Sequence, residues 1–176
     1  DKIIDRARLE VNKSPHSDLV HEVENVSKKY LACYHEDLDK FRIEKPDIEP
    51  KASEHINDMK VLISKLIDKG YAYSNKKDLF QGDIYFSINK FLKYGQLSGQ
   101  KKEEMLKNTR LDPNEKKKDP LDFTLWKVKE DEPEWKWGKG RPGWHIECSA
   151  MSMKCLSETF DIHGGGLDLK FPHNEN

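Results

Sequence analysis

The chain has 176 residues, of which 36% are charged and 35% hydrophobic, and its 31 Lys and Arg against 32 Asp and Glu give a net charge of −1. This length suggests one domain, or one domain that carries an insertion. The near-zero charge argues against a uniformly basic nucleic-acid-binding surface. No run reaches the roughly 18 apolar residues that a membrane span needs, so no membrane partner is expected. Seven Phe, six Tyr and four Trp argue against intrinsic disorder.

Three cysteines, Cys33, Cys148 and Cys155, form an odd and scattered set that does not indicate a disulfide framework. We expect reduced, intracellular thiols. The sequence starts at Asp1, with neither an initiator Met nor the charged-then-apolar pattern of a secretory signal, so a processed or trimmed N-terminus has to be considered. The expected location is cytoplasmic, with an organellar location as the alternative.

The first part of the sequence predicts two helices. Apolar residues recur at steps of three and four between positions 17 and 41, which is the period of an amphipathic helix. Pro46 and Pro50 then prevent the helix from continuing. A second apolar stripe predicts a helix over 52–69, and Gly70 follows it where a left-handed C-terminal cap is favoured.

The middle of the sequence predicts short strands and one loop. Alternating apolar residues indicate strands at 71–73 and 84–88, and another near 123–128. The stretch 100–120 has little apolar content and is predicted to be an exposed loop. Its lysine run, 116–118, is typical of a solvated surface; the alternative is that it contacts nucleic-acid phosphates.

The last forty residues contain a predicted helix, a short strand and a glycine-rich loop. Pro142 suits the first turn of the helix, and a strand at 160–162 leads into His163, the glycines 164–166 and Asp168. Loops that follow strands are where α/β folds bind ligands, and the equal alternative is that the glycine triplet forms a tight turn. An esterase oxyanion loop is excluded because the sequence has no Gly-x-Ser-x-Gly nucleophile elbow. The predicted buried face of the helix is Ile146, Ala150, Met153 and Leu156.

Cys148 and His173 carry a thiol and an imidazole, two donors that suit Zn²⁺. Two ligands do not complete a tetrahedral site, so the alternative is a buried thiol and an ordinary loop histidine. Cys155 is expected to pack in the core.

Two motifs near the end of the chain resemble those of a known enzyme family. The run GRPGWHIECSAM (140–151) and the run FDIHGGGLDLKFPHNEN (160–176) closely resemble the catalytic domain of cysteinyl-tRNA synthetase, a class I aminoacyl-tRNA synthetase. The resemblance extends through the chain in the family's order. Its further motifs are DKII (1–4), KPDIEP (45–50), YGQLSG (94–99) and DFTLWK (122–127).

The resemblance implies the fold class and the domain organisation. The expected fold is α/β, part of a Rossmann-type class I catalytic domain with an inserted α+β connective segment. Residues 1–50 would end the first half of this domain, 51–134 would form the insertion, and 135–176 would start the second half with the zinc and cysteine site.

The resemblance also implies an activity. The enzyme would activate L-cysteine with ATP and Mg²⁺ to cysteinyl-adenylate and transfer the cysteine to its tRNA, with one zinc per chain that selects the substrate thiolate, and it would act as a monomer. By residue matching, Cys148 and His173 would bind the metal, Trp144 and His163 would bind cysteine, and Gly165, Gly166 and Asp168 would bind the adenylate.

Several of the family's parts are not in this sequence. The ATP signatures of the HIGH and KMSKS types and two further zinc ligands have no counterpart in it, so the chain alone is expected to be inactive. Asn174 stands where a second His is common in the family. Two alternative functions stay open: a related ligase that joins cysteine to an amino sugar, and a non-catalytic zinc- or RNA-binding module.

Overall fold

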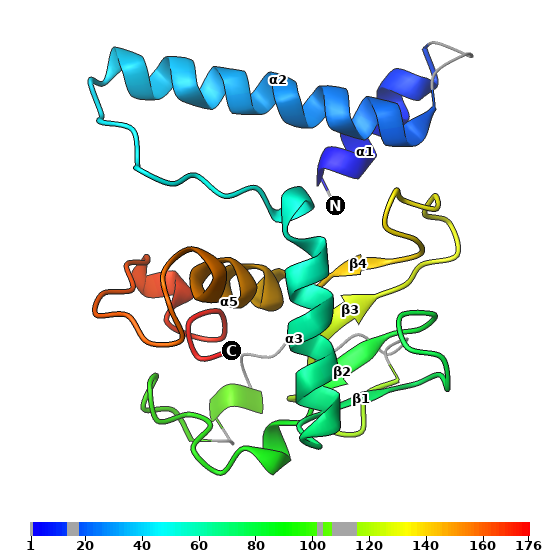
Figure 1. Ribbon diagram of the computed structural model, residues 1–176, viewed down its shortest axis with the longest axis vertical. Coiled ribbons are helices and arrows are strands. Elements are labelled where there is room, and N and C mark those ends of the chain that lie inside the picture. The colour runs from blue at the N-terminus through cyan, green and yellow to red at the C-terminus, as the bar shows by residue number, and fades with distance from the viewer. Residues whose placement is uncertain (1, 14–17, 102–103, 107–115) are drawn as a thin grey trace. The chain divides into compact units, whose positions relative to one another are not determined.

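The computed structural model describes residues 2–13, 18–101, 104–106 and 116–176, which form two compact units (Figure 1). The first unit is drawn from residues 1–49 and 133–136, and the second from 50–132 and 137–176. Within the described residues, no helix is long and apolar enough to cross a membrane.

The first unit is a helix pair. Helix α1 (Lys2–Val11) packs against α2 (Leu19–Lys40). Ala7 of α1 and Val26 of α2 are buried. The helix predicted over 17–41 is thus confirmed, whereas α1 was not predicted. The apolar stripe of α2 is only partly buried, because Tyr30 and Tyr34 toward its end are half-exposed.

The second unit is built on a sheet of four strands in the order β1-β2-β3-β4, and every neighbouring pair is antiparallel. The described residues therefore mix helices with an antiparallel sheet, and the Rossmann-type part of the predicted fold stays a prediction. The four strands are β1 (Ala72–Ser74), β2 (Ile84–Phe86), β3 (Phe123–Lys127) and β4 (Arg141–Pro142).

Helices α3 (Ile56–Asp68) and α5 (Trp144–Cys155) contact each other and the sheet, as Figure 1 shows. The helix predicted over 52–69 is confirmed, with a 3₁₀ turn over Ala52–Glu54 before α3. Gly70 ends it with φ +78°, and Tyr71 N donates to Leu66 O, so the chain turns directly into β1. The buried core is Ile56, Met59, Ile63, Ala72, Ile84, Leu125, Trp126, Ile146 and Ala150.

A smaller core lies beside this one. Met105 is buried with Ile88 and Leu121, so part of the predicted 100–120 loop is anchored by an apolar side chain. Residues 102–103 and 107–115 of that loop lie outside the described residues. The adjoining Lys118 places its Nζ 4.4 Å from the ring centre of Tyr73.

Three predictions for the last forty residues were wrong. Pro142 does not start the helix but lies in β4, an edge strand, where a residue without an N–H costs no ladder hydrogen bond. Met153 on α5 and Leu156, which follows the helix as its C-cap residue, are exposed. Residues 160–162 do not form a strand, because no neighbouring strand in the described residues pairs with them, and Ile162 is 86% exposed.

A buried carboxylate ties the sheet to the loops at one end. Asp122, 1% exposed, accepts hydrogen bonds from Tyr73 Oη (2.7 Å), Ile88 N (3.0 Å) and Asp119 N (3.2 Å). These donors come from β1, from the turn after β2 and from the entry to β3. Burying a charge is costly unless it is hydrogen-bonded, so this network satisfies Asp122 and fixes the loops around it.

We predict that Asp122→Ala lowers the free energy of unfolding by about 3 kcal/mol, because the Ile88 N–H is then buried without its acceptor. The measurement is denaturant unfolding of the full-length protein. Asp78→Asn, at an exposed site, is the control and should change the value by less than about 0.5 kcal/mol. Equal effects of the two substitutions would contradict the role of Asp122.

Candidate active site

The start of α5 presents two of the predicted site residues on one side of the helix. Gly143, the N-cap residue, donates its N–H to Leu125 O of β3 (2.9 Å), which sets where the helix begins. Trp144 and Cys148 follow four residues apart and so share a face, whereas Ile146 turns into the core. The Trp144 ring is 55% exposed and Cys148 is half-buried.

His173 packs on this helix start. Its ring stacks on the ring of Trp144 with a centroid distance of 4.2 Å and an interplanar angle of 18°. Its Nδ1 also lies 3.2 Å from Nδ1 of His145. Only one of these two nitrogens can carry the shared proton, so one ring donates to the lone pair of the other. If His173 is the donor, its Nε2 keeps a free lone pair.

Burial keeps these groups uncharged at neutral pH. Burial, and to a smaller extent the charge of His173, lower the pKa of His145 to about 4. The pKa of His173 is lowered by burial and by the nearby charge of His163. Burial and the charge of Glu147 raise the pKa of the Cys148 thiol. These side chains therefore offer neutral imidazoles and a protonated thiol.

The glycine-rich strip lies against the segment that carries His173. A Cβ on Gly165 would lie 3.1 Å from Nδ2 of Asn174, so the absence of a side chain there allows the two segments to approach. Asn174 N donates to Leu169 O at 2.8 Å. His163, Gly166 and Asp168 are exposed, and Asp168 is the second residue of a short 3₁₀ turn, Leu167–Leu169, that follows the glycines.

The last two residues of the chain dock on a different loop. The two carboxylate oxygens of Glu175 accept hydrogen bonds from Gly95 N and from Ser98 N, each at 2.7 Å. The side chain of Asn176 accepts a hydrogen bond from the hydroxyl of Tyr94. Burial and the charge of Glu175 raise the pKa of that hydroxyl.

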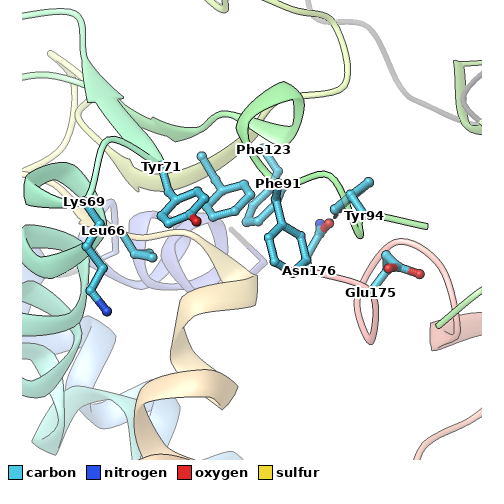
Figure 2. A pocket seen from close by; sticks show the side chains of 9 residues that line it. Leu66, Lys69, Tyr71, Phe91, Tyr94, Phe123, Glu175 and Asn176 are labelled. Carbon is cyan, nitrogen blue, oxygen red and sulfur yellow. Dashed lines mark hydrogen bonds between the residues drawn. The ribbon is translucent and has the colours of Figure 1, made fainter. Parts of the chain in front are cut away.

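A pocket of about 350 Å³ opens beside this contact. In Figure 2 the aromatic rings of Tyr71, Phe91 and Phe123 lie between Leu66 on α3 and Glu175. The pocket is thus an apolar hollow with one wall made by the segment that carries His173.

The structure brings together only part of the predicted site. Trp144 and His173 are in contact, Cys148 lies one turn along the helix from Trp144, and His163 is near enough for its charge to act on His173. Gly165, Gly166 and Asp168 lie on an exposed strip, which approaches Asn174, the neighbour of His173, at Gly165. In the part of the chain that the structure describes, no three His, Cys, Asp or Glu side chains are grouped to hold a metal ion.

The sequence did not identify His145 or Glu175 as site residues. Both stand inside the motifs GRPGWHIECSAM and FPHNEN, but their partners lie 28 and 80 residues away, so spacing along the chain gave no signal.

Comparisons with known proteins agree on one family. Residues 1–176 match the family described as "tRNA synthetases class I (C) catalytic domain". The whole chain is 53% identical to a cysteine–tRNA ligase from Sulfurihydrogenibium sp. (strain YO3AOP1) and covers 34% of that protein. It is 52% identical to one from Thermodesulfovibrio yellowstonii, with 35% of that protein covered, and 51% identical to one from Pseudomonas fluorescens (strain Pf0-1), with 36% covered. The chain thus spans about a third of the length of these relatives.

The depressed pKa of His145 predicts that stability falls in acid. The unfolded chain binds more protons than the folded one between pH 4 and about 6.5, so the free energy of unfolding should fall as the pH is lowered through this range. For this group the loss is of the order of 3 kcal/mol at most. The measurement is denaturant unfolding of metal-free protein at several pH values. His145→Phe, which cannot titrate, should flatten the dependence, and identical slopes for the two proteins would contradict the assignment.

Proposed function

The chain belongs to the family of class I (C) tRNA synthetase catalytic domains, and from this we propose that the full-length protein is a cysteine–tRNA ligase. It would activate L-cysteine with ATP and Mg²⁺ to cysteinyl-adenylate and transfer the cysteine to its tRNA. The names of the relatives support the overall reaction. The observation that carries the substrate assignment is the stack of Trp144 on His173 at the start of the helix that contains Cys148.

We propose that Cys148 and His173 hold one Zn²⁺. A thiol and a neutral imidazole are the donors that zinc prefers, so the residues fit the metal in chemistry, although they supply two ligands of four. When bound, zinc would supply a Lewis-acidic position for the substrate thiolate. The high thiol pKa of Cys148 means that its proton must leave on binding, so zinc affinity should increase with pH.

The side chains around the two donors have their own tasks in this proposal. Trp144 would hold the ring of His173 by stacking, and Nδ1 of His145 would accept a hydrogen bond from the Nδ1–H of His173, which leaves the Nε2 lone pair for the metal. His163 would contact the bound cysteine. The exposed strip of Gly165, Gly166 and Asp168 would receive the adenylate, because backbone without side chains allows close approach of a ligand.

A thiolate-binding metal explains how cysteine can be separated from serine. The two amino acids are nearly the same size, and an ordinary pocket that must reject a close isostere gains only ~1–3 kcal/mol. Bonding between a soft thiolate and zinc adds a chemical difference that a hydroxyl does not offer.

The proposal extends to the fold of the longer protein. We propose that residues 1–50 and 135–176 belong to the two halves of a Rossmann-type catalytic domain and that 51–134 is an insertion between them. Strands β1, β2 and β3 of this segment pair with each other in chain order, as we expect of an insertion, and β3 continues the sheet to β4 outside the segment.

The two half-buried cysteines of α5 provide a matched test of the metal assignment. Cys148→Ser in the full-length protein should lose bound zinc and cysteine-dependent pyrophosphate exchange together. Cys155→Ser should keep both and cost only packing, of the order of ~1 kcal/mol. Zinc content is measured by elemental analysis. Equal zinc loss in both variants would show that Cys148 is not a ligand.

Replacing Trp144 tests the stack on His173. Trp144→Ala should raise the Michaelis constant for cysteine about 2- to 10-fold, since an aromatic pair is worth about 0.5–1.5 kcal/mol, while the constant for ATP stays unchanged. Trp144→Phe keeps a ring and should show a smaller effect. The measurement is steady-state pyrophosphate exchange. An unchanged Michaelis constant for cysteine in the Ala variant would show that Trp144 does not contribute to cysteine binding.

A further inference from the structure

Both carboxylate oxygens of Glu175 bind the same loop. Each oxygen accepts a backbone N–H at 2.7 Å, one from Gly95 and one from Ser98. Hydrogen bonds to an ionised acceptor are about twice as strong as neutral ones. Gly95 and Ser98 are both buried, so without Glu175 these N–H groups would lose their acceptor away from bulk water.

The loop has a fixed shape that suits this acceptor. Gly95 has φ +94°, and a Cβ on it would lie 2.6 Å from Met105 Cε and 2.7 Å from Gln100 O. Gly99 N donates to Gly95 O at 2.9 Å and so closes the turn. The loop 94–99 is therefore a tight turn, packed on a buried methionine, that directs two N–H groups toward Glu175.

Glu175 and His173 belong to one short turn. Asn176 N donates to Pro172 O (2.9 Å), and Asn174 N donates to Leu169 O (2.8 Å), so residues 172–176 form one hydrogen-bonded unit. His173 leaves this turn toward Trp144 and His145, whereas Glu175 leaves it toward the loop. A constraint on Glu175 is thus a constraint on the position of the His173 imidazole.

We propose that Glu175 is a positioning residue for His173: by holding loop 94–99 it fixes the imidazole that the proposed function assigns to zinc. The inference rests on that proposed function. It gives the YGQLSG loop (94–99), which lies inside the segment 51–134, a part in the cysteine site. The loop acts there through Glu175 and not by contacting His173. Replacing a residue that hydrogen-bonds directly to a metal ligand typically costs 10- to 100-fold in metal affinity, and Glu175 acts one step further out, through the turn, so we expect an effect at the lower end of this range.

The test compares Glu175→Gln with wild type in the full-length protein. Glutamine keeps the size but accepts with one oxygen and turns an NH₂ toward the second backbone N–H. We expect zinc affinity, measured by chelator competition, to fall by about 10-fold. Hydrogen exchange of peptides over 94–99 should accelerate, and the Michaelis constant for cysteine should rise while that for ATP does not.

Two further variants keep the inference falsifiable. Glu158→Gln makes the same change at an exposed site and should behave as wild type. Gly95→Ala disturbs the loop from the other side, since it crowds Met105, and should reproduce the loss of zinc affinity. Wild-type zinc affinity and cysteine constant in Glu175→Gln, with faster exchange of the loop, would overturn the inference. A wild-type protein that holds no zinc would instead overturn the metal site of the proposed function.

Discussion

Two backbone N–H groups, those of Gly95 and Ser98, face away from solvent because their loop turns tightly on Met105, and Glu175 accepts both. We infer that the position of the His173 imidazole depends on this contact. The turn that contains Glu175 also directs His173 onto the start of α5 and sets Asn174 against Gly165. Four consecutive residues, 173–176, thus connect a helix, a glycine-rich strip and a loop that are far apart in the sequence.

The sheet fixes the other side of the site. Antiparallel strands bring β4 to the edge, and the hydrogen bond from Gly143 to β3 determines where α5 begins. Trp144 and Cys148 then follow from the helical period, with Ile146 and Ala150 as the buried anchor. A rigid helix start and a tethered turn meet at the His173 imidazole, which is the arrangement needed to hold a ligand side chain in one orientation.

Local patterns predicted the parts of the fold that local forces decide. The helix over 52–69 is predictable because its apolar period and the position of Gly70 indicate the same helix end. Strands β1 and β2 are predictable from their alternating apolar residues. The strand at 160–162 was wrong because a strand also needs a partner, which the described residues do not provide. Residue matching named Trp144 and His173, but not their stacking, and the 80-residue separation between Glu175 and Gly95 concealed the tether.

The most direct test of the account is zinc content together with amino-acid-dependent pyrophosphate exchange, measured on one preparation of the wild-type full-length protein. The account predicts about one zinc per chain and exchange that prefers cysteine over serine by well beyond the ~200-fold that an ordinary pocket can reach. Exchange without zinc, or exchange supported by serine within that factor, would contradict the claim that a metal held by Cys148 and His173 selects the substrate thiolate.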